Sequence, residues 1–194
     1  MAINAVPIKH KQFAVDEYEQ MIAAGVFRED ERLELIEGEI IEMSPIGSAH
    51  LAYVNRLNHL LVRRTGALAQ VSVQNPIHLT RSEPQPDIVL LRPRPDFFAE
   101  ALPGPTDVLL LIEVSDTTVD YDRSVKIPLY GREGIVECWL INVMEGLIEV
   151  YRGPGASGYR SKATFGAGDS LTAVSLPGVS LAVDDVIGRL PGES

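Results

Sequence analysis

Cysteine is almost absent from this chain of 194 residues, since Cys138 is the only one. A single thiol cannot form an internal disulfide, which excludes a disulfide-stapled secreted module and predicts a cytoplasmic protein. The N-terminal residues MAINAVPIKHKQF lack an apolar core followed by small residues, so we expect no signal peptide. The longest apolar runs, such as VLLLI, fall far short of the ~20 residues that span a bilayer, which predicts no membrane partner.

Several signatures of catalysis and metal binding are also missing. His10, His59 and His78 show no H-x-x-x-H spacing, and one cysteine cannot make a zinc knuckle. No G-x-S-x-G stands between a predicted strand and helix, which argues against an esterase serine. The glycine-rich GPGASG at 153–158 lies between predicted strands, so we interpret it as a hairpin loop rather than a phosphate-binding loop.

Positively charged residues are fewer than acidic ones. Lysine and arginine number 17 against 27 acidic residues, and the net charge is −10. That balance is an objection to nucleic-acid binding, which normally needs a basic surface. Charge can still be segregated, because six arginines lie in the middle of the chain: Arg56, Arg63, Arg64, Arg81, Arg92 and Arg94. The alternative is that the charges merely form solvated faces.

The residues that are present predict one α/β (α+β) domain over residues 1–194. Hydrophobic residues make up 45% of the chain, enough for a packed core. In the N-terminal half we expect a helix from 13 to Gly25, a hairpin over 32–43 turning at Glu37-Gly38, a second helix ending near Gly66, and a strand over 69–80 that is weakened at Pro76.

The second half predicts a mixed sheet. The apolar runs at 87–91 and 108–114 are typical of central strands covered on both faces. A helix is expected over 120–134, although Pro128 could kink it. A strand over 136–143 should pair with one over 147–153, and an antiparallel C-terminal section follows.

Two carboxylates stand at the boundaries of the central strands. If the strands are neighbours, Asp87 and Glu113 can converge on one hard cation such as Mg²⁺, with the carbonyl of Val114 as a further ligand. Such an ion could make a bound water more acidic and offset charge on a phosphodiester. Taken singly, Asp87 could be a turn residue and Glu113 a strand-end acid that reaches water.

A lysine and a histidine could complete the site. Arg123, Lys126 and Tyr130 share a face of the predicted helix, so the Lys126 ammonium could position water or stabilise phosphate charge. His50, at the start of the second helix, could hold water or contact phosphate. The simpler alternatives are a solvated helix lysine and a helix-entry histidine.

The order of three segments closely resembles the Uma two family of the PD-(D/E)XK nuclease superfamily. The segments are LELIEGEIIEMSPIGSAH, PDIVLL and IEVSDTTVDYDRSVKIPLYGREGIVECWLI, within a core of about 13–185. The resemblance implies a restriction-endonuclease-like fold, with a central mixed sheet flanked by helices. It also implies Asp87 and Glu113 as metal ligands and Lys126 as the catalytic cation. Glu37 and His50 match two further positions that recur in the family, which implies that they are accessory residues of the site.

This chain departs from the family pattern at a few positions. Related nucleases carry the lysine two residues after the second acid, where this chain has Ser115, and the family resemblance implies that Lys126 replaces it from the following helix. Cys138 and Asn142 stand where the family often has Tyr and Asp. These differences, together with Pro128 in the predicted helix, affect how the side chains of the site are oriented.

The sequence is compatible with two functions. The first is a Mg²⁺-dependent endonuclease, with Mn²⁺ as a substitute metal, that acts on DNA as its nucleic-acid partner. A homodimer would suit cleavage of both strands. The second is a nuclease-like fold without turnover that binds nucleic acid or protein, because a fold does not establish a function.

Overall fold

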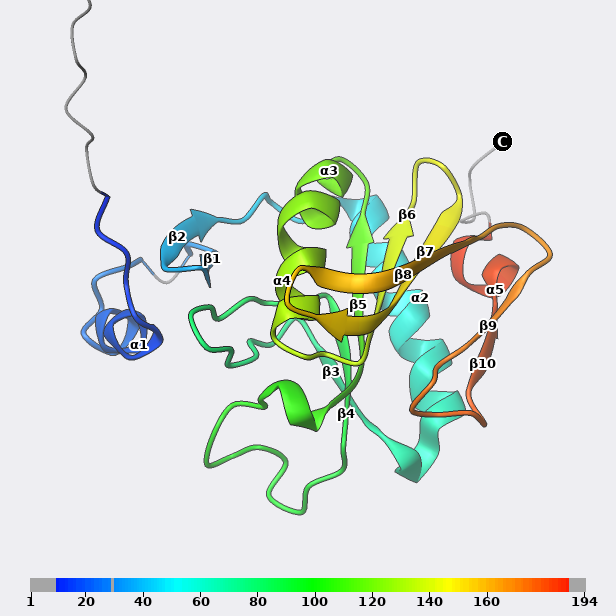
Figure 1. Ribbon diagram of the computed structural model, residues 1–194, viewed down its shortest axis with the longest axis horizontal. Helices are drawn as coiled ribbons and strands as arrows, with labels where there is room; N and C mark the ends of the chain where they lie inside the picture. Colours follow the sequence, from blue (N-terminus) through cyan, green and yellow to red (C-terminus); the bar gives the residue numbers. More distant parts are fainter. Residues whose placement is uncertain (1–9, 29, 189–194) are drawn as a thin grey trace, which may run out of the picture.

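The computed structural model describes residues 10–28 and 30–188. The chain begins with helix α1 (Val15–Ala23) and the antiparallel hairpin of β1 (Leu33–Ile36) and β2 (Glu39–Glu42). These elements lie at one side of the molecule, beside the main sheet (Figure 1). The hairpin turns at Glu37 and Gly38, both with positive φ, which confirms the turn predicted from the sequence.

A six-stranded mixed sheet forms the centre of the fold. Its order is β3-β4-β5-β6-β7-β8, with β5 and β6 parallel and every other neighbouring pair antiparallel. The strands are β3 (Gln70–Val73), β4 (Ile88–Leu91), β5 (Val108–Ser115), β6 (Glu137–Asn142), β7 (Leu147–Gly155) and β8 (Gly158–Phe165). The expected mixed sheet and its central strands are therefore confirmed.

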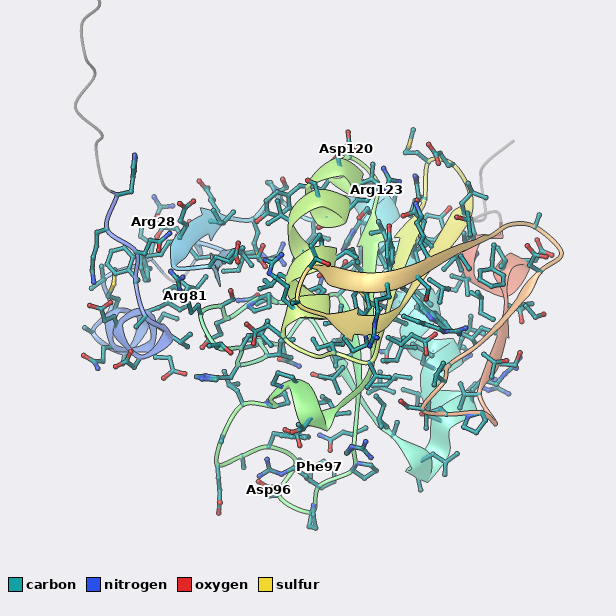
Figure 2. All side chains as sticks on the ribbon, viewed as in Figure 1. Arg28, Arg81, Asp96, Phe97, Asp120 and Arg123 are labelled. Atoms are coloured by element: carbon teal, nitrogen blue, oxygen red, sulfur yellow. The ribbon has the colours of Figure 1, made fainter. Side chains whose placement is uncertain are left out.

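The connections around β3 and β4 are long. The strand expected over 69–80 is shorter than predicted and ends at Val73, because a loop containing Pro76 leads from it to β4. The Pro- and Gly-rich connection after β4 runs to a short 3₁₀ turn, Pro105–Asp107. Asp96 and Phe97 mark the far end of this connection, well away from Asp120 and Arg123 at the opposite end of the molecule (Figure 2).

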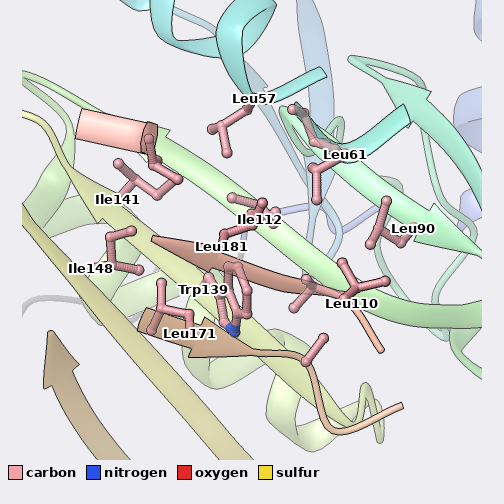
Figure 3. Packing of buried hydrophobic residues seen from close by; sticks show 14 of the residues in the cluster. Leu57, Leu61, Leu90, Leu110, Ile112, Trp139, Ile141, Ile148, Leu171 and Leu181 are labelled. Atoms are coloured by element: carbon pink, nitrogen blue, oxygen red, sulfur yellow. The ribbon is translucent and has the colours of Figure 1, made fainter. Parts of the chain in front are cut away.

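One face of the sheet packs against helix α2 (Ser48–Thr65) and the C-terminal elements. These are the antiparallel pair β9 (Ser170–Thr172) and β10 (Ser180–Ala182), and helix α5 (Val183–Ile187). Leu57 and Leu61 of α2 face Leu110 and Ile112 of β5, with Trp139 in the same cluster (Figure 3). The antiparallel C-terminal section predicted from the sequence is thus part of the core.

The opposite face is covered by one helical stretch. It consists of α3 (Val119–Tyr121), a π-helical segment (Asp122–Lys126) and α4 (Ile127–Arg132). Pro128 lies inside this stretch, just after the π-helical segment in which the backbone N–H of Ile127 bonds to the carbonyl of Asp122, and the helix continues past the proline to Arg132. Gly131 lets α4 approach β8 closely, since a Cβ there would lie 2.5 Å from the carbonyl carbon of Gly158. Within the described ranges, no helix is long and apolar enough to cross a membrane.

Candidate functional site

The two predicted metal ligands lie side by side on the face covered by α4. In β5, Leu111 and Glu113 point to that face, while Ile112 packs on the α2 side, because successive side chains alternate. Ile88 of β4 is opposite Ile112, so the preceding residue, Asp87, falls beside Glu113. The backbone N–H of Asp87 points to Glu113 Oε2, with 3.4 Å between nitrogen and oxygen.

The Asp87 carboxylate is held by three donors from separate elements. His50 Nε2 lies 2.8 Å from Oδ1, and Gln74 Nε2 lies 3.2 Å from the same oxygen. The backbone N–H of Val114 donates to Oδ2 at 2.9 Å. Asp87 is therefore fixed against the strand that carries Glu113, and its side chain keeps 13% exposure.

Lys126 reaches the same carboxylates from the helix. Its Nζ lies 2.9 Å from Glu113 Oε1 and 3.3 Å from Glu34 Oε2. Tyr130, one turn further on, donates from its hydroxyl to Glu113 Oε1 at 2.6 Å. The ammonium is buried, so the lysine is part of a closed ionic cluster rather than a solvated helix face.

Ser115 occupies the strand position where related nucleases have their lysine. Its side chain points to the same face as Glu113 and donates a hydrogen bond to the Asp122 carboxylate at the start of the π-helical segment. Thr118 donates to the same carboxylate at 2.9 Å. The hydrogen bond from Ser115 thus connects β5, which carries Glu113, to the helical stretch that carries Lys126.

Arg123 faces the same side of the sheet as Lys126 and Tyr130, but it contacts a different strand. It pairs with Glu149 of β7 at 2.9 Å and with Asp120 at 3.3 Å. Asp120 and Arg123 lie together at the α3 end of the helix (Figure 2). A π-helical turn is wider than an α-helical turn, so side chains around it leave the 3–4 spacing assumed from the sequence.

Burial controls the ionisation of the cluster. It raises the pKa of Glu113, while the ammonium of Lys126 opposes this shift and favours the charged carboxylate. Burial alone would lower the pKa of Lys126, but the carboxylates of Glu113 and Glu34 outweigh it and raise that pKa, so the ammonium stays charged at neutral pH. The hydrogen bond with Asp87 raises the pKa of His50.

The two accessory residues have different positions. His50 contacts Asp87 directly and lines the cavity beside the carboxylates. Glu37 lies at the exposed hairpin turn, where its carboxylate accepts a hydrogen bond from Arg132 at 2.8 Å and its backbone N–H donates to Ser82 Oγ. The structure therefore brings together Asp87, Glu113, Lys126 and His50, but it places Glu37 outside this group.

Three residues of the site were not predicted from the sequence. Glu34 is Lys126's second partner, although the hairpin pattern over 32–43 gave no sign of this contact. Tyr130 was expected on the right face of the helix, but its bond to Glu113 had no sequence signal. Tyr121 lines the cavity, and its hydroxyl is buried with no hydrogen-bond partner among the described residues.

A cavity of about 440 Å³ opens next to this cluster between the β1–β2 hairpin, the start of α2 and the helix. Its walls carry more acidic than basic side chains. The acidic side chains are Glu34, Glu42, Asp87, Asp116 and Asp122, against Arg32 and Lys126. An excess of carboxylates attracts cations, so the cavity suits a hard metal ion better than an unaccompanied anion.

The mid-chain arginines largely serve contacts within the fold. Arg94 pairs with Asp96 at 2.6 Å, and Arg92 donates to the carbonyl of Thr106. Arg64 and Arg81 likewise donate to oxygens elsewhere in the chain. These contacts reduce the number of cations that could form a separate basic surface.

Comparison with known proteins found a matching family and solved structures with a similar fold. The model of the Uma2 family, described as "Putative restriction endonuclease", matches residues 15–184. A solved structure described as a "putative nuclease belonging to DUF820 from Anabaena variabilis" has a TM-score of 0.72 and 19% identity, covering 90% of this chain and 97% of that one. At that identity, the likeness shows a shared fold. No curated protein matches the chain.

Proposed function

The chain belongs to the Uma two (Uma2) family of restriction-endonuclease-like proteins, and from that premise we propose that it is a Mg²⁺-dependent endonuclease that hydrolyses phosphodiester bonds in DNA. One observation carries the proposal. Asp87 and Lys126 line the cavity, and the buried Glu113 lies next to Asp87 and 2.9 Å from the Lys126 ammonium. Two acids and a lysine at a cavity are the groups that metal-assisted hydrolysis of a phosphodiester needs.

The donor set fits a hard divalent ion. Asp87 and Glu113 would hold it, and Val114, which lines the same cavity, would offer its carbonyl oxygen. Lys126 and Tyr130 both use Oε1 of Glu113, which leaves Oε2 with only a long contact to a backbone N–H. Mg²⁺ and Mn²⁺ both accept carboxylate, carbonyl and water oxygens. When bound, such an ion offsets phosphodiester charge and makes an attacking water more acidic.

Lys126 acts by charge and position in this proposal. Its raised pKa keeps the proton on Nζ, so it serves as a fixed donor for the attacking water or a phosphate oxygen rather than as a base. Glu34 and Glu113 hold the ammonium from two sides, which limits the directions it can take.

His50 is a positioning residue. It fixes one oxygen of Asp87 from α2, while Val114 fixes the other from β5. Groups that orient a ligand in this way are worth about 10–100-fold in metal affinity or activity. The further parts of the proposal are a cytoplasmic location and a homodimer, which would present two sites to a duplex.

The test is a cleavage assay on duplex DNA, single-stranded DNA and RNA, with Mg²⁺ or Mn²⁺ and with chelator. We expect metal-dependent cleavage of DNA, and a loss of at least about 100-fold in Asp87→Asn and Lys126→Met. Lys162→Met is the matched control, since this lysine is partly exposed and pairs with Glu149 away from the cavity. Unchanged rates in Asp87→Asn and Lys126→Met would overturn the site. Absence of both cleavage and metal binding in the wild type would favour the non-catalytic binding module.

A further inference from the structure

Three side chains with metal-binding atoms meet outside the catalytic cavity. They are Glu19 of α1, and His78 and Glu83 of the loop between β3 and β4. One ligand atom from each lies within 4.8 Å of the other two. Nδ1 of His78 is 3.7 Å from Oε1 of Glu19. Among residues 10–28 and 30–188, no other group of three or more acidic, histidine or cysteine side chains comes together in this way.

The main chain holds the loop residues in place. Glu83 pairs with Leu35 of β1 in both directions, at 2.7 and 3.3 Å. The backbone N–H of Leu79 donates to the carbonyl of Ser82, which folds His78 and Glu83 toward each other. The backbone N–H of His78 donates to the carbonyl of Pro103 at 2.9 Å. Two of the three ligands are therefore preorganised by hydrogen bonds that do not involve their side chains.

The third side chain comes from a helix that packs on the same strand. Tyr18 is buried against Leu35, and its hydroxyl donates to the carbonyl of Leu33 at 3.2 Å. Glu19, the next residue, remains about half exposed and reaches His78 at the edge of the loop. The cluster therefore lies where α1, β1 and the loop meet.

Glu83 is the unexplained member of the cluster. Its side chain belongs to a residue that is only 6% exposed, and Oε2 has no hydrogen-bond partner in the described parts of the chain. Burial, followed by the neighbouring Glu19, raises the pKa of Glu83 to about 7. A buried carboxylate that faces a second carboxylate is costly unless a cation or a proton compensates it.

We propose that Glu19, His78 and Glu83 form a second divalent-cation site, which takes a first-row metal such as Zn²⁺ or Mn²⁺. One imidazole and two carboxylates suit these ions, whereas the all-oxygen pair of Asp87 and Glu113 suits Mg²⁺. The ion satisfies the buried oxygen of Glu83 and leaves at least one position for water.

The site has a structural role, because its ligands come from segments far apart in sequence. The ion joins α1 to the loop and, through the backbone pairing of Glu83, to β1. Strand β1 also carries Glu34, which contacts Lys126. Metal binding therefore stabilises the N-terminal elements and holds one wall of the catalytic cavity.

The experiment uses the full chain with Asp87→Asn and Glu113→Gln, so that the cavity carboxylates do not compete for the metal. After treatment with chelator, Zn²⁺ is titrated by calorimetry, and thermal unfolding is followed with and without the ion. We expect one Zn²⁺ per chain and a higher Tm. Adding His78→Ala should raise Kd at least about tenfold and remove the rise in Tm. His59→Ala, on the exposed face of α2, is the matched histidine control and should leave both unchanged.

Glu83→Gln separates metal binding from folding. It preserves the shape of the buried side chain and removes its charge. Without metal at pH 8, the variant should therefore have a Tm equal to or higher than that of the parent. Addition of Zn²⁺ should not raise the Tm of the variant. Co²⁺ absorption gives an independent readout, because the bands should disappear in His78→Ala and persist in His59→Ala. The proposal is overturned if Zn²⁺ leaves the Tm of the parent unchanged, or if it raises the Tm equally in His78→Ala and Glu83→Gln.

Discussion

The replacement of Lys126 by methionine tests the ionic cluster apart from any activity. The Lys126 ammonium is buried between Glu113 at 2.9 Å and Glu34 at 3.3 Å, and all three side chains are no more than 5% exposed. Methionine keeps much of the stem but leaves two buried carboxylates without their cation. Removing one partner of a buried ion pair costs about 3–5 kcal/mol, a large part of the ~5–15 kcal/mol that stabilises a typical domain.

The assay is urea unfolding at pH 7.5 in the presence of chelator. Trp139 is the only tryptophan and is fully buried, so its fluorescence reports on the core. We expect Lys126→Met to lower the free energy of unfolding by about 3–5 kcal/mol with little change in the m value. The matched control, Lys162→Met, removes a 2.8 Å pair with Glu149 from a lysine that is 42% exposed, and should cost about 0–1 kcal/mol.

A double-mutant cycle identifies the cause of the loss. If uncompensated carboxylates carry the penalty, Glu34→Gln should be destabilising alone but should recover part of the stability in the Lys126→Met background. The expected coupling is about 0.5–3 kcal/mol. A penalty from uncompensated carboxylates is contradicted if Lys126→Met lowers the free energy of unfolding no more than Lys162→Met, or if the effects of Glu34→Gln and Lys126→Met simply add.

Three further predictions concern separate parts of the fold. His50→Ala should raise the Mg²⁺ concentration for half-maximal cleavage about 10–100-fold, because Asp87 loses an orienting partner; an unchanged value would contradict this. Gly131→Ala should cost about 1–3 kcal/mol in urea unfolding, since its Cβ would overlap the backbone of β8, whereas Gly178→Ala meets open space and should cost much less. Burial would raise the pKa of Glu149, but hydrogen bonds led by that of Arg123 lower it to about 2. The stabilisation is therefore present above pH ~4.5 and is lost as the pH falls toward 2, so Glu149→Gln should cost roughly 2 kcal/mol at pH 7 and little near pH 2; a deficit that is independent of pH would refute this assignment.

The sequence predicted the sheet well because burial leaves a clear pattern. Runs such as VLLLI are apolar at every position when both faces are covered, and the structure covers β5 with α2 on one side and α4 on the other. The same alternation places Asp87 and Glu113 on one face once β4 and β5 are neighbours. The sequence alone could not show which residues of neighbouring strands lie opposite each other.

The parts that were missed depend on contacts between distant segments. The hairpin over 32–43 was predicted, but its pattern could not show that Glu34 contacts Lys126, because the two residues lie in distant segments. Helical periodicity placed Arg123 on the same face as Lys126, but it could not show that Arg123 contacts β7, because a π-helical turn has no simple sequence signature. Glu19 and His78 are nearly sixty positions apart, so no ligand spacing could reveal the cluster they form with Glu83.

Anomalous diffraction from crystals of the full chain soaked in Mn²⁺ tests the proposed catalytic site most directly. We expect an ion bound by the carboxylates of Asp87 and Glu113, with ligand distances of about 2.0–2.2 Å, and the Lys126 ammonium still against Glu113. A Mn²⁺ peak at the cluster of Glu19, His78 and Glu83, with none between Asp87 and Glu113, would contradict the proposed catalytic site and leave the second site standing.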